Sequence, residues 1–190
     1  MKLKTTLIAL AIAAMSVAAA PASWANSLTF QDVTFNLTAL DSDTLVLNIL
    51  GAASTTDSDW ADAMTIKNFS LKGIGTVSGA SVAGEGSWSV SANELNANGC
   101  TGGNSHGFCF TNSLTSGLQL DDDMTFTINF TSGTLDLTGN TLKVRFLDLQ
   151  GNKEGSLLSK NIPVPEPASL MLLGAGLAGI GIWRRKSTKI

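Results

Sequence analysis

The chain has 190 residues, 44% of them hydrophobic, with 12 lysines and arginines against 15 aspartates and glutamates, for a formal net charge of −3. Six of the cations but only one of the anions lie in the two apolar ends, so the central stretch has 6 cations, 14 anions and a net charge of −8. Such an acidic surface argues against nucleic acid and anionic lipid as partners of the central stretch, and it supports solubility.

The first 25 residues have the three parts of a secretory signal peptide. Two lysines make a positive start, residues 7–20 are apolar, and the small residues Ser23 and Ala25 stand at positions −3 and −1 of a cut. We expect a signal-peptide helix here, with cleavage by signal peptidase after Ala25 or, as the alternative, after Ala22. The general secretion machinery would export the remainder of the chain.

Alternating apolar and polar residues predict strands in the central stretch, residues 26–162. Residues 124–131 alternate without a fault, as in a half-buried strand, and residues 141–146 repeat the pattern. The residues between them, 138–140, have hairpin chemistry and predict a turn that joins the two strands. Further strand candidates are residues 33–38, 45–49, 64–71, 87–92, 108–110 and 134–137.

These elements predict an all-β class. Strands separated by turn signals roughly every ten residues are typical of an antiparallel β-sandwich, of jelly-roll or immunoglobulin-like type. The stretch from 26 to 162 has about 137 residues, which suits one extracytoplasmic domain. No long amphipathic helix is expected in it, and residues 58–64 are at most one helical turn.

Aspartates gather at three places in this domain. Carboxylates that lie close together in a loop are the oxygen ligands that calcium takes. The middle cluster lacks the glycine and the distal glutamate of an EF-hand loop, and aspartate is also common in solvated turns and at helix starts. We expect no metal and no cofactor, and calcium remains the alternative. The clusters are Asp41/Asp43, Asp57/Asp59/Asp62 and Asp121/Asp122/Asp123.

The domain contains two tryptophans, each of which could either pack in the core or bind a ligand at the surface. Trp88 stands in an alternating stretch and is expected to face the core. Trp60 stands among acidic residues and is the better candidate for an exposed platform on which a sugar ring would stack. Packing in the core is the alternative for both, because tryptophan is usually mostly buried.

Cys100 and Cys109 enclose a glycine-rich loop that also contains His106. In an exported chain, two cysteines most simply form one disulfide. The alternative is a metal site made of these three residues, for which no fourth ligand is evident. His106 is the single histidine, so a serine or cysteine hydrolase mechanism would need it. No G-x-S-x-G elbow accompanies it, and we expect no catalytic residue.

The C-terminal tail has three parts in a fixed order. Pro163, Pro165 and Pro167 hold the chain extended, which is the form that a protease engages. Residues 168–183 are almost uncharged and would make a single transmembrane helix about 24 Å long, somewhat short for a bilayer core of about 30 Å. Arg184, Arg185 and Lys186 then act as a basic stop-transfer signal that holds the end in the cytoplasm.

The tail resembles the PEP-CTERM sorting signal of Gram-negative bacteria. Val164-Pro165-Glu166-Pro167 corresponds to the start of that signal, followed by its glycine-rich span and basic end. The resemblance implies that residues 163–190 are recognised by exosortase, a membrane-embedded, transpeptidase-like cysteine protease that cleaves near the Pro-Glu-Pro motif. It also implies export linked to exopolysaccharide and biofilm matrix. The catalytic residues would belong to exosortase, and this chain would be its substrate.

The sequence therefore predicts an exported, membrane-anchored precursor that is delivered to the cell surface or the extracellular matrix. Its expected role is non-enzymatic, and structural or adhesive. One alternative is a carbohydrate-binding or calcium-dependent adhesion module, with exopolysaccharide as a partner. A small polysaccharide-modifying hydrolase is a further alternative, and a buried carboxylate pair in a cleft would favour it.

Overall fold

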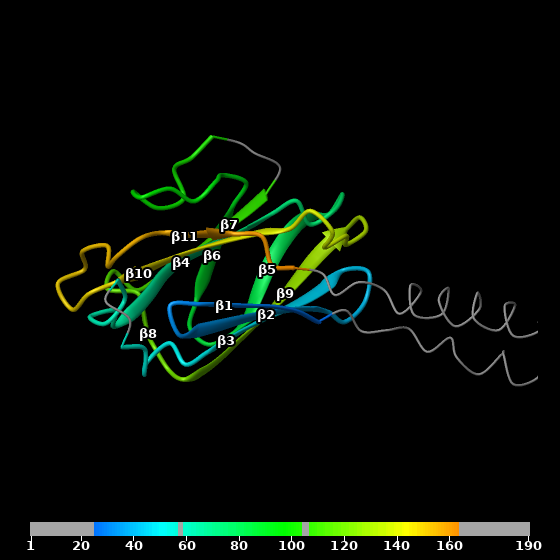
Figure 1. The fold of residues 1–190 in the computed structure, drawn as a ribbon. Coiled ribbons are helices and arrows are strands. Elements are labelled where there is room, and N and C mark those ends of the chain that lie inside the picture. Colours follow the sequence, from blue (N-terminus) through cyan, green and yellow to red (C-terminus); the bar gives the residue numbers. More distant parts are fainter. Residues whose placement is uncertain (1–24, 57–58, 104–106, 164–190) are drawn as a thin grey trace, which may run out of the picture.

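A computed structural model of the protein describes residues 25–56, 59–103 and 107–163. Within these residues the chain forms eleven strands in two antiparallel sheets (Figure 1). Sheet A has the order β1 (Ala25–Phe30), β2 (Val33–Ala39), β3 (Thr44–Leu50), β9 (Asp123–Ser132) and β5 (Ser78–Gly84). Sheet B has the order β11 (Leu158–Lys160), β10 (Thr141–Leu147), β4 (Thr65–Lys72), β7 (Gly107–Asn112) and β6 (Trp88–Ser91), with β8 (Leu118–Gln119) also paired to β4.

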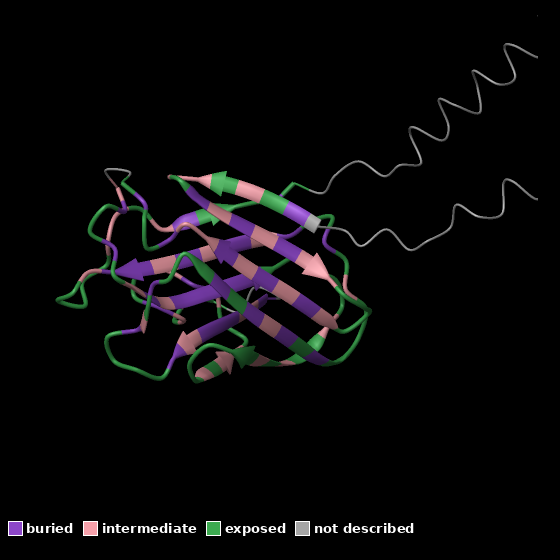
Figure 2. Cartoon of the chain, turned by 90° about the horizontal axis from the view of Figure 1, so that it is seen from below, coloured by how far each residue is buried: buried purple, intermediate pink, exposed green. Residues whose placement is uncertain are grey.

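The two sheets pack face to face around one hydrophobic core. Along β9, every second residue from Met124 to Phe130 is buried, as the sequence alternation predicts. Figure 2 shows this striping of buried and exposed residues along the strands. Phe126 of sheet A and Phe69 of sheet B bring their ring centroids within 5.4 Å across the core. The predicted all-β, antiparallel sandwich is therefore confirmed.

The predicted hairpin between residues 124–131 and 141–146 is wrong. Both segments are strands, β9 and β10, but β9 lies in sheet A and β10 in sheet B. The connecting residues cross from one sheet to the other, and residues 134–137 contribute an isolated bridge between Gly75 and Leu135 instead of a strand. Turn chemistry marks where a strand ends but does not fix which sheet receives the next one.

The described chain starts and ends at the same end of the sandwich, which we call the terminal end. Ala25 pairs with Thr38, close to the β2–β3 turn, and Leu135 donates its backbone N–H to Ser42 of that turn. Lys160 of β11 pairs with Leu142, near the start of β10. Figures 1 and 2 both show the chain entering and leaving on this side. The opposite end, which we call the far end, is where β10 finishes and β4 begins.

The described residues contain no helix long and apolar enough to cross a membrane. The expected signal-peptide helix lies almost wholly outside the described residues, and the C-terminal transmembrane helix lies entirely outside them. The single helical turn considered for residues 58–64 is not formed by the described part of that segment, which makes hydrogen-bonded turns.

Candidate functional site

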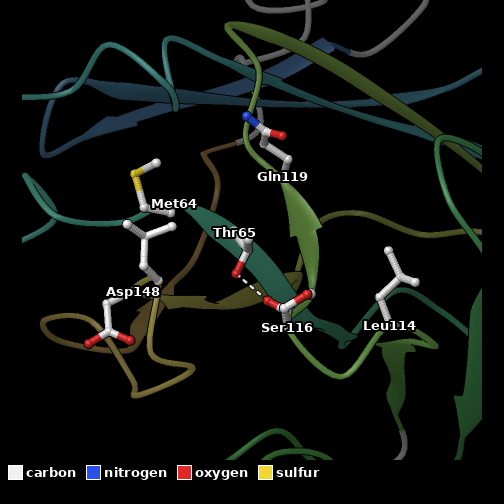
Figure 3. A pocket seen from close by; sticks show the side chains of 8 residues that line it. Met64, Thr65, Leu114, Ser116, Gln119 and Asp148 are labelled. Atoms are coloured by element: carbon white, nitrogen blue, oxygen red, sulfur yellow. Dashed lines mark hydrogen bonds between the residues drawn. The ribbon is translucent and has the colours of Figure 1, made fainter.

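The far end of the sandwich holds a hollow of about 340 Å³ with an exposed apolar rim. Met64 is 38% exposed, Leu114 55% and Leu149 74%; these are three of the four large hydrophobic side chains that are exposed in the described part of the chain. In Figure 3 Met64 and Asp148 lie on one side of Thr65 and Leu114 on the other. The remaining lining residues are Ser116, Gly117 and Gln119.

Backbone pairing at the strand ends holds this rim in place. Met64 donates its N–H to Leu147 O at 2.9 Å and accepts from Leu120 N at 2.9 Å, which ties the entry of β4 to β10 and to the segment after β8. The Thr65 hydroxyl donates to Ser116 O at 2.5 Å, the bond drawn in Figure 3. The rim is therefore fixed by strands, while its apolar side chains face solvent.

The 114–117 turn needs glycine at its end. Gly117 has a φ of +86°, and a Cβ there would come within 2.9 Å of Ile66 O. The Lys67 amino group donates to Asn112 O at 2.7 Å and also to Leu114 O, so it anchors both sides of the turn. Burial, with Arg145 nearby, lowers the pKa of Lys67. The turn that carries Leu114 is thus set by one glycine and one half-buried cation.

The other side of the hollow is acidic. The Asp148 carboxylate accepts hydrogen bonds from Asn152 Nδ2 at 3.0 Å and from Asn152 N at 2.7 Å, and these bonds hold the pKa of Asp148 below its usual value. A neighbouring hollow of about 260 Å³ shares Met64, Asp148 and Leu149 and adds Asp62 and Glu154. Apolar side chains flanked by carboxylates suit contact with a partner surface.

The predicted disulfide is present. Cys100 and Cys109 are joined with their Cα atoms 5.6 Å apart. The bridge fastens the loop after β6 onto the outer face of sheet B. There Arg145, Asn68 and Thr111 stand opposite one another on three adjacent strands. Arg145 Nη1 donates to Asn68 Oδ1 at 3.2 Å, and Asn68 Nδ2 donates to Thr111 Oγ1 at 2.9 Å.

The expected exposed platform at Trp60 is wrong. Trp60 is 1% exposed, and its ring makes edge contacts with Phe30, Phe35 and Phe146. Its indole N–H donates to Ser156 O at 3.1 Å, which satisfies the polar edge inside the core. Trp88 is half-buried against Phe69 and Phe126, as its strand pattern predicts. No sugar can stack on Trp60 in this fold.

The aspartate clusters lie at different ends of the domain. Asp41 and Asp43 form the β2–β3 turn at the terminal end, where Asp43 N donates to Asp41 Oδ1 at 3.1 Å. Asp121–Asp123 and Asp62 lie toward the far end. The described residues contain no group of three or more histidine, cysteine or acidic side chains placed to hold a metal ion. Asp57 and His106 lie outside the described residues, as do Val164, Pro165, Glu166, Pro167, Arg184, Arg185 and Lys186.

The exit of the chain at the terminal end is held by one side chain that the sequence analysis missed. Asn140 is 1% exposed, and its amide bonds both backbone polar groups of Ile162. Asn140 looked like an ordinary turn residue, because asparagine favours turns. The apolar Leu149 in a polar Asp-Leu-Gln-Gly turn was the available sign of the far-end rim.

Comparison with known proteins identifies the tail. Residues 163–186 match the family model described as PEP-CTERM protein-sorting motif. No curated protein matches the chain. Among solved structures, the chain is similar to an uncharacterized protein from Nocardia farcinica whose crystal structure reveals an immunoglobulin-like fold. The identity is 9%, the match covers 74% of this chain and 94% of that one, and the TM-score is 0.38.

Proposed function

We propose that this chain, which carries a PEP-CTERM protein-sorting motif at residues 163–186, is cleaved by exosortase and leaves a structural or adhesive β-sandwich at the cell surface or in the extracellular matrix. The motif implies an exported protein whose membrane-anchored precursor depends on exosortase for sorting. The cleavage, the adhesive role and the link to exopolysaccharide and biofilm are our proposal. The observation that carries it is the placement of the apolar rim at the end opposite to the chain exit.

The tether geometry supports this role. Ile162 is buried and clamped by Asn140, and the apolar run begins at residue 168. Five residues span at most about 18 Å when fully extended. Before cleavage, the terminal end of the domain would therefore lie close to the membrane. The rim residues Met64, Leu114 and Leu149 would then point away from the membrane. An exposed apolar surface of this kind marks a contact site on many soluble proteins.

The sorting is tested by altering the motif. Pro165→Ala combined with Glu166→Ala should abolish cleavage, so the protein should stay in the membrane fraction at precursor size on a blot. Asn161→Ala, an exposed change just outside the motif, serves as the control and should be processed like the wild type. Equal size and equal release of the motif variant and the control would refute exosortase-dependent processing.

A second candidate is a carbohydrate-binding or calcium-dependent adhesion module. The far-end rim favours it, because Met64, Leu114 and Leu149 flank hydrogen-bonding groups and carboxylates. Calorimetry of the processed protein with the host polysaccharide, with and without a chelator, decides between binding and a purely structural role. Leu149→Asn should lower the affinity at least about tenfold. Leu40→Asn is the matched control, since Leu40 is also exposed but lies at the terminal end.

A non-enzymatic role is also our proposal. The Asp43 carboxyl, whose pKa is raised chiefly by its hydrogen bond to Asp41 and by the repulsion between the two carboxylates, is fully exposed on a turn. A hydrolase needs a pair of carboxyls held on either side of a bound sugar. Incubation of the processed protein with the host polysaccharide should release no reducing ends, and such release would overturn the proposal.

A further inference from the structure

Strand β5, Ser78–Gly84, is an edge strand of sheet A. It pairs with β9 on one side, and no backbone hydrogen bond joins its other side to a described residue. The strand reads Ser-Gly-Ala-Ser-Val-Ala-Gly, without a charge or a proline. Natural proteins usually protect edge strands with lysine, proline, strong bulges or covering segments. β5 has an irregular pairing only at Gly79, and its register runs unbroken from Ala80 to Gly84.

The other sheet edges differ from β5. The edges of sheet B are short, with four residues in β6 and three in β11. The opposite edge of sheet A, β1, lies near β11, whose Lys160 amino group sits 5.2 Å from the centroid of the Phe30 ring. β5 is thus the longest edge strand of the described fold, with seven residues against six in β1.

The side chains of β5 are suited to pairing with an identical strand. If two copies run antiparallel about Ser81, Ala80 faces Val82 and Gly79 faces Ala83. All of these side chains are small or apolar, and none brings like charges together. A two-fold contact of this kind must be self-complementary, because the same patch meets itself. The domain as a whole carries −8, so the absence of charge along β5 is what permits two copies to approach there.

We propose that β5 pairs antiparallel with β5 of a second copy of this chain, so that the two five-stranded sheets become one continuous sheet. β5 runs from the terminal end, where Ser78 pairs with Ser132, toward the far end, where Gly84 pairs with Phe126. Antiparallel pairing therefore directs the terminal ends of the two copies in opposite directions. The pair links chains that are held on two facing surfaces rather than side by side on one.

The linking of facing surfaces rests on the proposed surface location, whereas the pairing itself does not. A ladder of about five residues on each side is a small interface and binds weakly in solution. Many copies on each surface would compensate, since linked weak contacts gain strongly in avidity. The exposed serines and small residues of β5 thus fit a reversible contact between many copies.

Cysteine cross-linking tests the pairing directly. The described chain has no free cysteine, so Ser81→Cys introduces a single reactive thiol. Residues directly opposite on antiparallel strands have their Cβ atoms about 4.5–5.5 Å apart, close to the distance that a disulfide spans. Ser27→Cys, exposed on the opposite edge strand β1, is the matched control. In processed protein purified from the host, mild oxidation should give covalent dimer at least about tenfold faster with Cys at 81 than at 27.

Two further measurements make the outcome decisive. Ser81→Lys should abolish concentration-dependent dimers in sedimentation, and beads carrying the protein by its C-terminus should clump only without this substitution. Equal cross-linking at the two positions, faster cross-linking at position 27, or dimers that survive Ser81→Lys would each overturn the pairing. The cross-linking uses purified protein, so a failure of exosortase processing in the cell would not change its result.

Discussion

Asn140 and Ile162, 22 positions apart, are joined through one side chain and one peptide group. Asn140 Nδ2 donates to Ile162 O at 2.9 Å, and Asn140 Oδ1 accepts from Ile162 N at 3.2 Å. The same Nδ2 donates to Leu137 O at 2.6 Å. One buried amide therefore closes the connection between the sheets and fixes the last buried residue before the sorting motif.

Replacing this amide should loosen the exit of the chain. Asn140→Leu leaves buried backbone groups of Ile162 without partners, and each such group costs about 1–3 kcal/mol. We expect the free energy of unfolding in urea to fall by about 2–4 kcal/mol, with faster proteolysis near Pro163. Asn161→Ala removes only an exposed bond to Thr141 and should change stability by less than about 0.5 kcal/mol. Similar losses in the two variants would show that the clamp has no special role.

Reducing the disulfide should destabilise the domain. The bridge closes a loop of about ten residues, and the chain-entropy account gives about 2.7 kcal/mol for a loop of this length. We expect a lower melting temperature in dithiothreitol and an equal loss in the Cys100→Ser/Cys109→Ser variant, which should be insensitive to the reductant. An unchanged melting temperature in both cases would contradict a stabilising role for the bridge.

Replacing Trp60 should destabilise the domain more than replacing Trp88, because Trp60 lies inside the core and Trp88 at its edge. Trp60→Phe removes the bond to Ser156 O and leaves space between the rings of both sheets, so we expect a loss of about 2–4 kcal/mol. Trp88→Phe should cost less, because Trp88 is only half-buried and bonds Glu85 O near the surface. Acrylamide should quench the fluorescence of the Trp60→Phe protein more strongly than that of the Trp88→Phe protein. The reverse order would contradict the burial of Trp60.

Gly117 and Gly151 have similar φ angles, so alanine at each position allows the cost of backbone strain to be distinguished from the cost of a steric clash. Gly151 has a φ of +81° in open space, whereas Gly117 has a φ of +86° and no room for a Cβ. Gly151→Ala should cost about 1–2 kcal/mol, the cost of a left-handed conformation. Gly117→Ala should cost at least about 1 kcal/mol more and should shift the turn that carries Leu114. If urea denaturation gave equal costs for Gly117→Ala and Gly151→Ala, the turn at Gly117 would accommodate a Cβ without further loss of stability.

Asp136 should make stability depend on pH in the acid range. Hydrogen bonds from Thr138 N, the larger cause, and from the Thr138 hydroxyl lower the pKa of Asp136 below its ordinary value of 3.8. A lowered folded pKa contributes stability that is present above pH 3.8 and is lost as the pH falls through the folded pKa. Asp136→Asn retains an acceptor oxygen without the titration, so its stability should fall less between pH 4 and pH 2. Parallel curves for the two proteins would exclude this contribution.

The sequence predicted the strands whose two faces differ. β2, β3, β9 and β10 were found because each alternates apolar residues toward the core with polar residues toward solvent. β5 was missed because its serines, glycines and alanines give almost no contrast between faces, and its edge position leaves it largely exposed. The same lack of contrast is what suits β5 to a partner strand.

Contacts between distant residues were not predictable from local pattern. The acidic neighbours of Trp60 suggested exposure, but its burial is decided by Phe30, Phe35 and Phe146, which local sequence does not place beside it. The far-end rim likewise combines Met64, Leu114 and Leu149, which come together only because β4 begins close to where β7 and β10 end. The sorting motif could be recognised from the sequence alone, since it consists of contiguous residues.

β9 and β10 lie late in the chain, which delays the completion of both sheets during folding. β9 is paired with both β3 and β5, and β10 is paired with β4. Neither sheet can be completed until residues 123–147 are available for pairing, and sheet B also needs β11, which lies just before the tail. Strand pairs separated by long stretches of chain also form slowly. On the proposed export route, the domain would therefore complete its β pairing only as the last residues before the sorting tail emerge, so that secretion and folding would finish together.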